Sequence, residues 1–382
     1  MPWKETGPVL ERMRFIEDYL SGCYTLTELA SRYEVSRQTL HKWLARHDAD
    51  GAKGLMDRSR RPLHSPQIVD QDVAERIIAF RRRFPLMGPR KIVARLSELH
   101  PEINWPAAST AGDILRRAGL VTARRRRNPP AHPLRTRAAP LEPNDLMTVD
   151  YKGEFLLGNH RYCYPLTVVD YISRFIFACA AFASTQYAHT RRAFEVVFRE
   201  YGLPLAILSD NGSPFGSPGL ARLSRLSLWW IRLGVRVERI VPGHPEQNGA
   251  HERMHRTLKA ETTRPPESTL DRQQERFDRF RDHFNNERPH EALGQKRPAT
   301  IYRPSPRPYP ETLPPIEYAG HLEVRKVDHT GMIRWNNDRL FLSHTLEGEF
   351  VGLEEIDDGI WSLYYGPVLL ARFDEREQRF YG

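Results

Sequence analysis

The sequence has few cysteines and none of the patterns that cysteine-dependent sites require. The three cysteines among 382 residues, Cys23, Cys163 and Cys179, lie in unrelated contexts. There is no CxxC pair and no cluster of cysteine and histidine at zinc-ligand spacing. We therefore expect no zinc site of that kind, and a reducing cytoplasm is the expected environment.

Long apolar runs are also absent. No stretch approaches the roughly 20 consecutive apolar residues that a membrane helix needs. The first eight residues, MPWKETGP, lack the apolar segment of a secretory signal. We expect a cytoplasmic protein that is neither exported nor bound to a membrane.

Acidic residues are scarce in the first part of the chain. Lys and Arg total 57 against 48 Asp and Glu, and residues 1–140 alone carry 26 basic and 15 acidic side chains. Because Lys and Arg that neutralise phosphates release condensed counterions, this excess indicates a polyanion such as DNA as the partner. A generally basic soluble surface is the alternative. The length predicts about two to four domains.

Residues 1–60 are expected to form three short helices. A first apolar stripe recurs at helical spacing and comprises Val9, Met13, Ile16 and Leu20. A second helix is expected from Thr25, where TLTE is a capping box that pairs Thr25 with Glu28. The third, over 37–46, turns its apolar side chains toward a core; these are Leu40, Trp43 and Leu44.

The third helix would leave its polar side chains in solvent. They are Arg37, Gln38, His41 and Lys42. Two short helices around a tight turn, with such donors on the second, are typical of a helix-turn-helix, whose donors reach base edges and phosphates in the major groove. We expect residues 1–60 to be a DNA-binding domain of this kind, with a purely structural three-helix bundle as the alternative.

A second helical DNA-binding domain, winged-helix-like, is expected over residues 67–122, after an Arg- and Pro-rich linker at 54–66. Its helices are expected near 73–80, 88–99 and 104–120. Its last helix would expose Arg116 and Arg117. The following linker, 123–143, is basic and Pro-rich and is expected near DNA, with a merely solvated tether as the alternative. Its cluster of arginines is Arg124, Arg125, Arg126 and Arg127.

Residues 144–302 alternate predicted strands and helices. Strands are expected at 146–155, twice within 164–182, at 205–210 and at 235–241, and helices at 189–202 and 248–262. This order predicts a mixed sheet flanked by helices. Residues 318–382 are rich in β-formers broken by glycines and predict a small antiparallel β-barrel. The whole chain is thus expected to be a multidomain α, α/β and β protein.

Three acids stand at the ends of predicted elements, where side chains can converge. Asp150 ends the apolar run of its strand, Asp210 closes LAILSD, and Glu252 lies early in its helix. Around them TVDYKG, SDNGSPF and HPEQNGAHERMHRTLK, followed by FNNERPHEAL, resemble the catalytic core of retroviral integrases and bacterial insertion-sequence transposases. The resemblance covers about residues 140–302, and several motifs occur in the same order. The N-terminal modules also resemble those of such transposases.

The resemblance implies a ribonuclease H-like core that cuts and rejoins DNA. Two Mg²⁺ ions, for which Mn²⁺ substitutes, would stabilise the attacking and leaving oxygens of an in-line transfer. In that scheme Asp150 bridges both ions while Asp210 and Glu252 each hold one. Three acids without a metal would repel one another, which favours cation binding. Hydrolysis would nick the element ends, and their 3′-hydroxyls would then join target DNA.

The choice of the third acid needs an argument of its own. Many enzymes of this superfamily place it 36 positions after the second, which here gives Glu246 rather than Glu252. Glu246 lies between Pro245 and Gly249, in a predicted loop. Glu252 lies on a predicted helix, which holds a ligand more rigidly, so we favour Glu252. Asp170 also ends a predicted strand, but resembling sequences carry an acid there without a catalytic role.

Two basic residues follow Glu252 on its own helical face. Arg256 and Lys259 are expected to contact a DNA end, as such positions do in resembling integrases, with a solvated helix face as the alternative. The expected partners are double-stranded DNA, namely the terminal repeats of the element and the target, and further copies of the chain in a synaptic complex. A nucleoid-associated location follows.

The C-terminal region departs from the integrase pattern. Residues 311–382 carry 14 acidic and 7 basic side chains, whereas the corresponding barrel of retroviral integrases is basic. We therefore expect this region to serve protein assembly. The leading hypothesis is a DNA transposase. The alternatives are a DNA-binding regulator with an inactive core and a structural scaffold without affinity for DNA.

Overall fold

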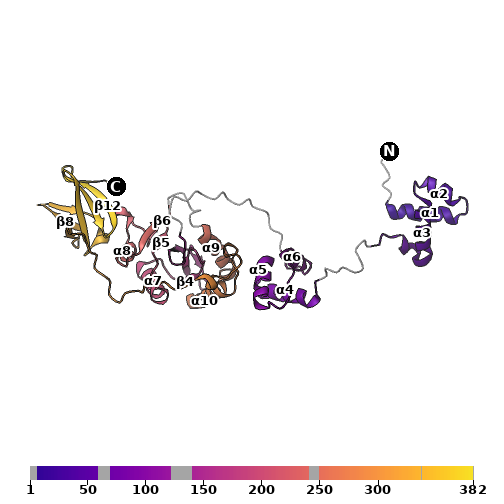
Figure 1. Ribbon diagram of the computed structural model, residues 1–382, viewed down its shortest axis with the longest axis horizontal. Coiled ribbons are helices and arrows are strands. Elements are labelled where there is room, and N and C mark those ends of the chain that lie inside the picture. Colours follow the sequence, from indigo (N-terminus) through magenta and orange to yellow (C-terminus); the bar gives the residue numbers. More distant parts are fainter. Residues whose placement is uncertain (1–6, 59–68, 122–139, 241–248, 337, 382) are drawn as a thin grey trace. The chain divides into compact units, whose positions relative to one another are not determined.

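The computed structural model describes residues 7–58, 69–121, 140–240, 249–336 and 338–381. The chain divides into two compact units, residues 1–68 and 69–382, which are treated separately below (Figure 1). No helix among the described residues is long and apolar enough to cross a membrane.

The first unit consists of three helices and a short 3-10 turn. They are α1 (Pro8–Leu20), α2 (Leu26–Arg32), α3 (Arg37–Asp50) and η1 (Gly51–Leu55). The capping box at Thr25 is confirmed, because its hydroxyl accepts from the Glu28 amide at 3.3 Å while the Glu28 carboxylate accepts from the Thr25 amide at 2.8 Å. Leu29, Leu40 and Trp43 form the core together with side chains from α1.

Two expectations for this unit are wrong in detail. The buried face of α1 carries Phe15 and Ile16, whereas Met13 and Leu20 are 38% and 69% exposed. The face is rotated because Phe15 packs edge-on against Tyr33, with ring centroids 6.0 Å apart. The linker also does not begin at 54, since Leu55 is 1% exposed in the core and its carbonyl accepts from an α1 guanidinium at 2.8 Å.

The second unit begins with a three-helix module, residues 69–121, here called the second helical module. Its helices are α4 (Gln71–Arg83), α5 (Pro89–Leu99) and α6 (Ala108–Arg117). Their shared core comprises Ile77, Met87, Ile92, Leu96, Ala111 and Leu115. The helices agree with the sequence analysis. The described residues of the module contain no strand, so they show no wing.

A six-stranded mixed sheet forms the centre of the second unit. Its strands are β1 (Leu146–Tyr151), β2 (Phe155–Leu156), β3 (Tyr162–Asp170), β4 (Ile176–Phe182), β5 (Ala206–Ser209) and β6 (Arg236–Arg239). The order is β2-β3-β1-β5-β6, and β4 also pairs with β3. Strand β1 is antiparallel to β3 and parallel to β5, and β5 is parallel to β6.

Helices cover both faces of this sheet, as the sequence predicts. On one face α7 (Tyr187–Tyr201) and α8 (Arg225–Arg232) pack on Met147 and Val149 of β1. On the other, α9 (Gly249–Thr262) and α10 (Leu270–Asn286) pack on β3 and β4. Side chains alternate between the two faces along a strand. Thr148 and Asp150 of β1 therefore belong to the face covered by α9.

Helix α8 is not among the helices that the sequence analysis predicts. Trp229 and Trp230 belong to the core of the central sheet. Leu228 and Ile231 belong to a second core, formed with the C-terminal strands. The helix is therefore buried from two sides.

The C-terminal region is antiparallel, as expected, and its described residues form no closed barrel. Its strands are β7 (Glu323–Lys326), β8 (Met332–Trp335), β9 (Asp338–Phe341), β10 (Phe350–Asp357), β11 (Ile360–Tyr365), β12 (Val368–Asp374) and β13 (Arg379–Tyr381). The five-stranded sheet β13-β12-β11-β10-β7 and the β8-β9 hairpin remain open among the described residues. One side of the region is closed by α8 instead. The short elements η2 (Leu220–Arg222), η4 (Glu291–Leu293), α11 (Pro298–Ile301) and η5 (His344–Leu346) complete the unit.

Candidate active site

Two of the three candidate acids lie at the same end of two adjacent strands in the central sheet. In the parallel pair β1 and β5, Thr148 is opposite Leu208. Two residues further along each chain come Asp150 and Asp210. The sheet thus brings both carboxylates to the carboxyl ends of adjacent parallel strands. Binding sites of open α/β sheets commonly form at these strand ends.

The electrostatics of Asp150 show that the acids influence one another. Its pKa is raised to about 7, first by burial and then by the charge of Asp210, with a smaller contribution from Glu252. The nearby Lys152 opposes the rise in this pKa. The Asp150 side chain is nevertheless 24% exposed, so a ligand can reach it.

The loop after β5 is held by an arginine that the sequence analysis missed. Arg239 of β6 donates to the carbonyls of Asp210 at 3.1 Å and Phe215 at 2.8 Å. The Gly212 amide donates to the Asp210 carboxylate at 3.1 Å. These contacts fix both the backbone and the side chain of Asp210. No motif in the sequence singles out Arg239, because the contact depends on the β5-β6 pairing.

Helix α9 presents Glu252 on an exposed surface, in its first turn. Arg256 and Lys259 are exposed on the same helix, while Met254 and Leu258 are 5% and 0% exposed against α10 and the sheet. The rival Glu246 lies outside the described residues.

A buried histidine pair fastens α9 to the sheet directly behind Asp150. His251 and His255 are 2% and 5% exposed. The Thr167 hydroxyl on β3 lies 2.6 Å from Nε2 of His251 and 2.7 Å from Nε2 of His255. It also donates to the Asp150 carbonyl at 3.1 Å. One hydroxyl thus joins β1, β3 and α9.

Hydrogen-bond counting gives one consistent set of tautomers for this pair, in which His251 accepts at Nδ1 from the Thr148 hydroxyl 2.8 Å away. A hydroxyl has one proton, so when Thr167 donates it to the Asp150 carbonyl, both imidazoles must donate to Thr167 from Nε2. Burial lowers the pKa of His251 to about 3, and burial together with His251 lowers the pKa of His255 to about 2. Both rings are therefore neutral at physiological pH, and they act as donors of fixed geometry.

Replacing Thr167 by valine is expected to lower both stability and cleavage. Valine keeps the shape but leaves two buried imidazole N–H groups without an acceptor, which costs about 1–3 kcal/mol of unfolding free energy. Thr167→Ser keeps the hydroxyl and is expected to retain DNA cleavage within about threefold, whereas the valine variant loses at least about tenfold because α9 shifts. Urea unfolding and a cleavage assay measure the two effects. Equal cleavage by both variants would refute a positioning role.

Asp170 has structural contacts instead of catalytic ones. It is 0% exposed and accepts from the amides of Asn144 at 2.8 Å and Ser173 at 2.6 Å. Burial raises the pKa of its carboxyl, and these hydrogen bonds oppose the rise. It pairs with Met147, at the opposite end of β1 from Asp150. These contacts account for Asp170 without a catalytic role.

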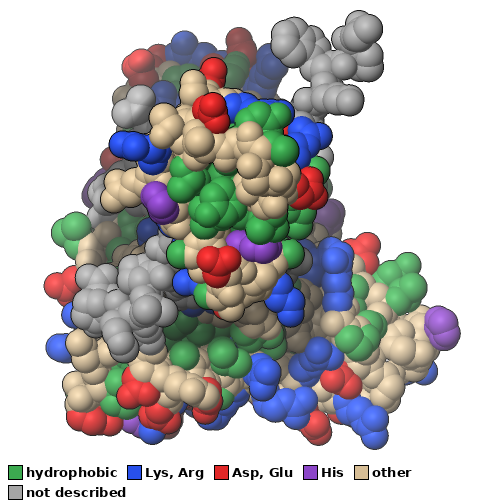
Figure 2. Space-filling view, turned by 90° about the vertical axis from the view of Figure 1, so that its right-hand side faces the viewer, with side chains coloured by type: hydrophobic (Ala, Val, Ile, Leu, Met, Phe, Trp, Pro, Cys, Tyr) green, Lys and Arg blue, Asp and Glu red, His purple; other side chains and the backbone are tan. Residues whose placement is uncertain are grey.

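The candidate DNA contacts on the helical modules are exposed. On α3 these are Arg37, Gln38, His41 and Lys42, and on α6 they are Arg116 and Arg117. Arg116 pairs with Asp113 at 2.8 Å. Arg124, Arg125, Arg126 and Arg127 lie outside the described residues. Figure 2 shows Lys and Arg side chains at the surface among acidic and hydrophobic ones.

The carboxylate oxygens of the site suit a divalent cation, although the three candidate acids do not lie close together. Among the described residues, no group of three or more His, Cys, Asp or Glu is close enough to hold a metal ion. The pKa of Asp150 is raised first by burial and then by the charges of Asp210 and Glu252, and a hard cation would relieve that repulsion among the carboxylates.

Comparison with protein families finds DNA-binding helical domains in the first part of the chain and an integrase core in its centre. Two models described as an integrase core domain match residues 140–245 and 233–298. A helix-turn-helix domain model matches residues 11–62, and a homeodomain-like domain model matches residues 39–115. The expectations of N-terminal helix-turn-helix modules and of an integrase-like central sheet are therefore confirmed.

Relatives that match most of the chain come from bacterial insertion elements. The chain is 26% identical over 288 residues to the insertion element IS476 uncharacterized 39.2 kDa protein of Xanthomonas euvesicatoria, covering 75% of this chain and 80% of that protein. It is 27% identical over 253 residues to the IS407 uncharacterized 31.7 kDa protein of Burkholderia multivorans, covering 64% and 87%.

Solved structures that resemble the chain include retroviral integrases. The HTLV-2 integrase catalytic core domain in complex with magnesium matches with 17% identity and a TM-score of 0.35, covering 43% of this chain and 99% of that one. A simian T-cell lymphotropic virus intasome chain matches with 17% identity and a TM-score of 0.38, covering 78% and 97%. By its family models and its insertion-element relatives, the chain is similar to bacterial insertion-sequence transposases of the integrase superfamily.

Proposed function

We propose that this chain is a DNA transposase that recognises the ends of its element, nicks them and joins the 3′-hydroxyl ends to target DNA. The observation that carries the proposal is the pair Asp150 and Asp210, which stand at the same edge of adjacent parallel strands. The electrostatic effect of Asp210 and Glu252 on Asp150 supports a shared site.

Asp150, Asp210 and Glu252 would hold the divalent ions. Mg²⁺, or Mn²⁺ in its place, would supply charge stabilisation at the attacking and leaving oxygens of the phosphodiester. The residues of the chain provide the rest. Arg239 fixes the Asp210 backbone, Thr167 fixes the Asp150 backbone, and the exposed face of α9 gives DNA access to Glu252.

The remaining parts would bind DNA and assemble the complex. The helix-turn-helix and the second helical module would bind the terminal repeats, and Arg256 and Lys259 would contact the DNA end near Glu252. The acidic C-terminal sheet, with 14 acidic and 7 basic side chains in residues 311–382, suits contacts with other protein chains better than contacts with DNA. A homo-oligomer on paired DNA ends follows.

A cleavage and strand-transfer assay tests this function. The DNA flanking the gene supplies the substrate, because inverted repeats there identify the element ends. Mg²⁺-dependent nicking at a repeat end, followed by joining to a second duplex, is the expected result. Binding of the repeat without any nicking would favour the alternative, a DNA-binding regulator with an inactive core.

Replacing Arg37 by alanine is expected to weaken binding to the repeat DNA. The side chain is exposed in the first turn of α3, so its loss should remove a contact to a base or phosphate without unfolding the helix. We expect a loss of affinity of about tenfold, within the range of about 1–3 kcal/mol for such a contact. A gel shift in EDTA over a series of salt concentrations measures it.

Lys53→Ala is the matched control for Arg37→Ala. It removes one exposed positive charge from η1 and none from α3. Its affinity should remain within about twofold of wild type, since a single screened charge contributes little. An equal loss in both variants would mean that α3 does not face the DNA, and a loss of helical circular dichroism in Arg37→Ala would show that Arg37 supports the fold.

A further inference from the structure

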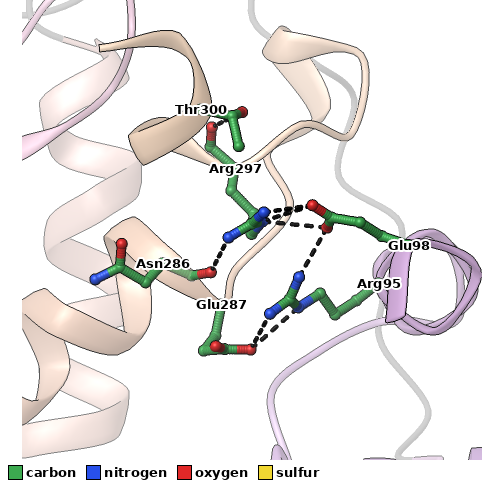
Figure 3. Close-up of polar contacts among 6 residues, drawn as sticks. All are labelled: Arg95, Glu98, Asn286, Glu287, Arg297 and Thr300. Atoms are coloured by element: carbon green, nitrogen blue, oxygen red, sulfur yellow. Dashed lines mark hydrogen bonds and ion pairs between the residues drawn. The ribbon is translucent and has the colours of Figure 1, made fainter. Parts of the chain in front are cut away.

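The second helical module contacts residues 286–297, a segment that follows α10 and is here called the docking segment. Figure 3 shows Arg95 and Glu98 of α5 facing Glu287 and Arg297. Arg95 donates to Glu287 Oε2 from Nε at 3.0 Å and from Nη2 at 2.7 Å, and from Nη1 to Glu98 at 2.8 Å. Arg297 donates to Glu98 and, at 2.9 Å, to the Asn286 carbonyl. The ion pairs form one continuous chain across the contact.

This contact is more than a pair of surface salt bridges. The Arg95 side chain is 7% exposed and that of Arg297 is 22% exposed. Burial tends to raise the pKa of Glu98, but hydrogen bonds from Arg297 and Arg95 outweigh it and lower this pKa. Beside them Phe84 stacks on His283 of α10, with ring centroids 4.7 Å apart and an interplanar angle of 9°. Arg95 places two donors on one oxygen of Glu287, and Arg297 reaches both oxygens of Glu98, so these partly buried pairs are specific in geometry.

The docking segment is also tied to the helix that carries Glu252. Arg288 is 8% exposed and donates to Glu261 of α9 at 2.8 Å. Nδ1 of His283 lies 3.7 Å from the same carboxylate. Neighbouring residues of this part of the chain therefore contact different partners: Glu287 contacts the second helical module, and Arg288 contacts α9.

We infer that residues 286–297 dock the second helical module on the catalytic core, and that this docking keeps a DNA end bound by the module in a fixed position relative to Asp150 and Asp210. The docking itself rests on the contacts of Arg95, Glu98, Glu287 and Arg297. Its effect on DNA rests on the proposed function.

The docking can be tested without DNA. A specific protease site is inserted within residues 122–139 of the full-length chain, the chain is cut there, and size-exclusion chromatography follows the two pieces. The wild-type pieces should co-elute. Arg95→Glu should separate them, with an apparent dissociation constant raised at least about tenfold, because three carboxylates then meet. The double variant Arg95→Glu, Glu287→Arg should restore co-elution.

Arg90→Glu is the control for this experiment. Arg90 pairs with Glu291 at 3.6 Å, but both side chains are 75% exposed, so its reversal should leave the pieces together. Separation of the wild-type pieces would overturn the docking. So would Arg95→Glu pieces that stay together, or a double variant that stays apart although its circular dichroism matches that of wild type.

A second experiment tests the effect on DNA with the uncut full-length chain. Arg95→Glu should bind repeat DNA within about threefold of wild type yet cleave it at the repeat end at least about tenfold more slowly, because misplacement by about 1 Å is already costly. The charge-swapped double variant should recover cleavage. Wild-type cleavage kinetics and cleavage position in Arg95→Glu would overturn the positioning effect. Absence of cleavage by wild type would instead refute the proposed function and leave the co-elution result intact.

Discussion

Replacing Asp150 by asparagine is expected to reduce DNA cleavage more than a thousandfold while DNA binding persists. The amide keeps the shape of the side chain but loses the charge that binds a divalent ion. Each tenfold loss of rate corresponds to about 1.4 kcal/mol of activation free energy, so such a drop fits the loss of a metal ligand. Glu154→Gln, an exposed neighbour, is the control and should keep its activity. Full cleavage by Asp150→Asn, or full wild-type activity in EDTA, would rule out the mechanism.

The same substitution should stabilise the metal-free protein at alkaline pH. The pKa of Asp150 is raised to about 7 in the folded state, whereas an unfolded aspartate titrates near its ordinary value of about 3.9. Between these two values the folded state binds more protons than the unfolded state, so this carboxyl lowers stability as pH rises from about 4 to about 7. At pH 8 asparagine removes a destabilisation on the order of 2–4 kcal/mol.

Urea unfolding in EDTA at pH 5 and pH 8 measures this change. The wild-type protein should lose more stability between the two pH values than Asp150→Asn does. An asparagine variant that is less stable than wild type at pH 8 would show that Asp150 supports the fold. Loss of activity combined with a gain in stability would identify a residue kept for its chemistry.

Replacing Glu252 by glutamine should abolish cleavage and strand transfer, whereas Glu246→Gln should leave most activity. Glu252 lies in the first turn of α9, whose buried side is held by Met254 and Leu258 in the core and by His251 and His255 on Thr167. A ligand on a helix anchored in this way keeps its position, and misplacement by about 1 Å can cost about a hundredfold in rate. Single-turnover cleavage with Mg²⁺ compares the two variants.

Mn²⁺ binding gives a second measurement for the glutamates. Isothermal titration without DNA should show weaker binding by Glu252→Gln than by Glu246→Gln, because only the former loses a ligand. The opposite order in both assays would identify Glu246 as the third acid of the site. The spacing of 36 residues would then be the better guide than the position on a helix.

The strand ends that carry Asp150 and Asp210 could be predicted because the sequence patterns that mark them are local. Apolar runs that end at Asp150 and Asp210 mark the ends of β1 and β5, and the pairing of those strands follows from the alternation of strands and helices. The capping box at Thr25 is equally local. The identity of the elements and the place of two acids could therefore be predicted without a structure.

The missed features depend on contacts between distant segments. His251 and His255 stand among polar residues, and their burial follows from Thr167, more than 80 positions away. Arg239 acts through the carbonyls of another strand. Helix α8 has apolar residues on two sides, which removes the single stripe by which a helix is recognised. The open C-terminal sheet likewise follows from its packing on α8, and composition gives no sign of that packing.

The double burial of α8 has a consequence for how the chain loses its structure. Trp229 and Trp230 pack in one core while Leu228 and Ile231 pack in the other, so the same eight-residue helix closes both. Removing the C-terminal strands would leave Leu228 and Ile231 facing water, and this apolar surface would weaken the catalytic sheet and invite aggregation. We therefore expect the two regions to unfold as one cooperative unit despite their different strand patterns, and a shortened chain that ends before β7 to lose the stability of the central sheet.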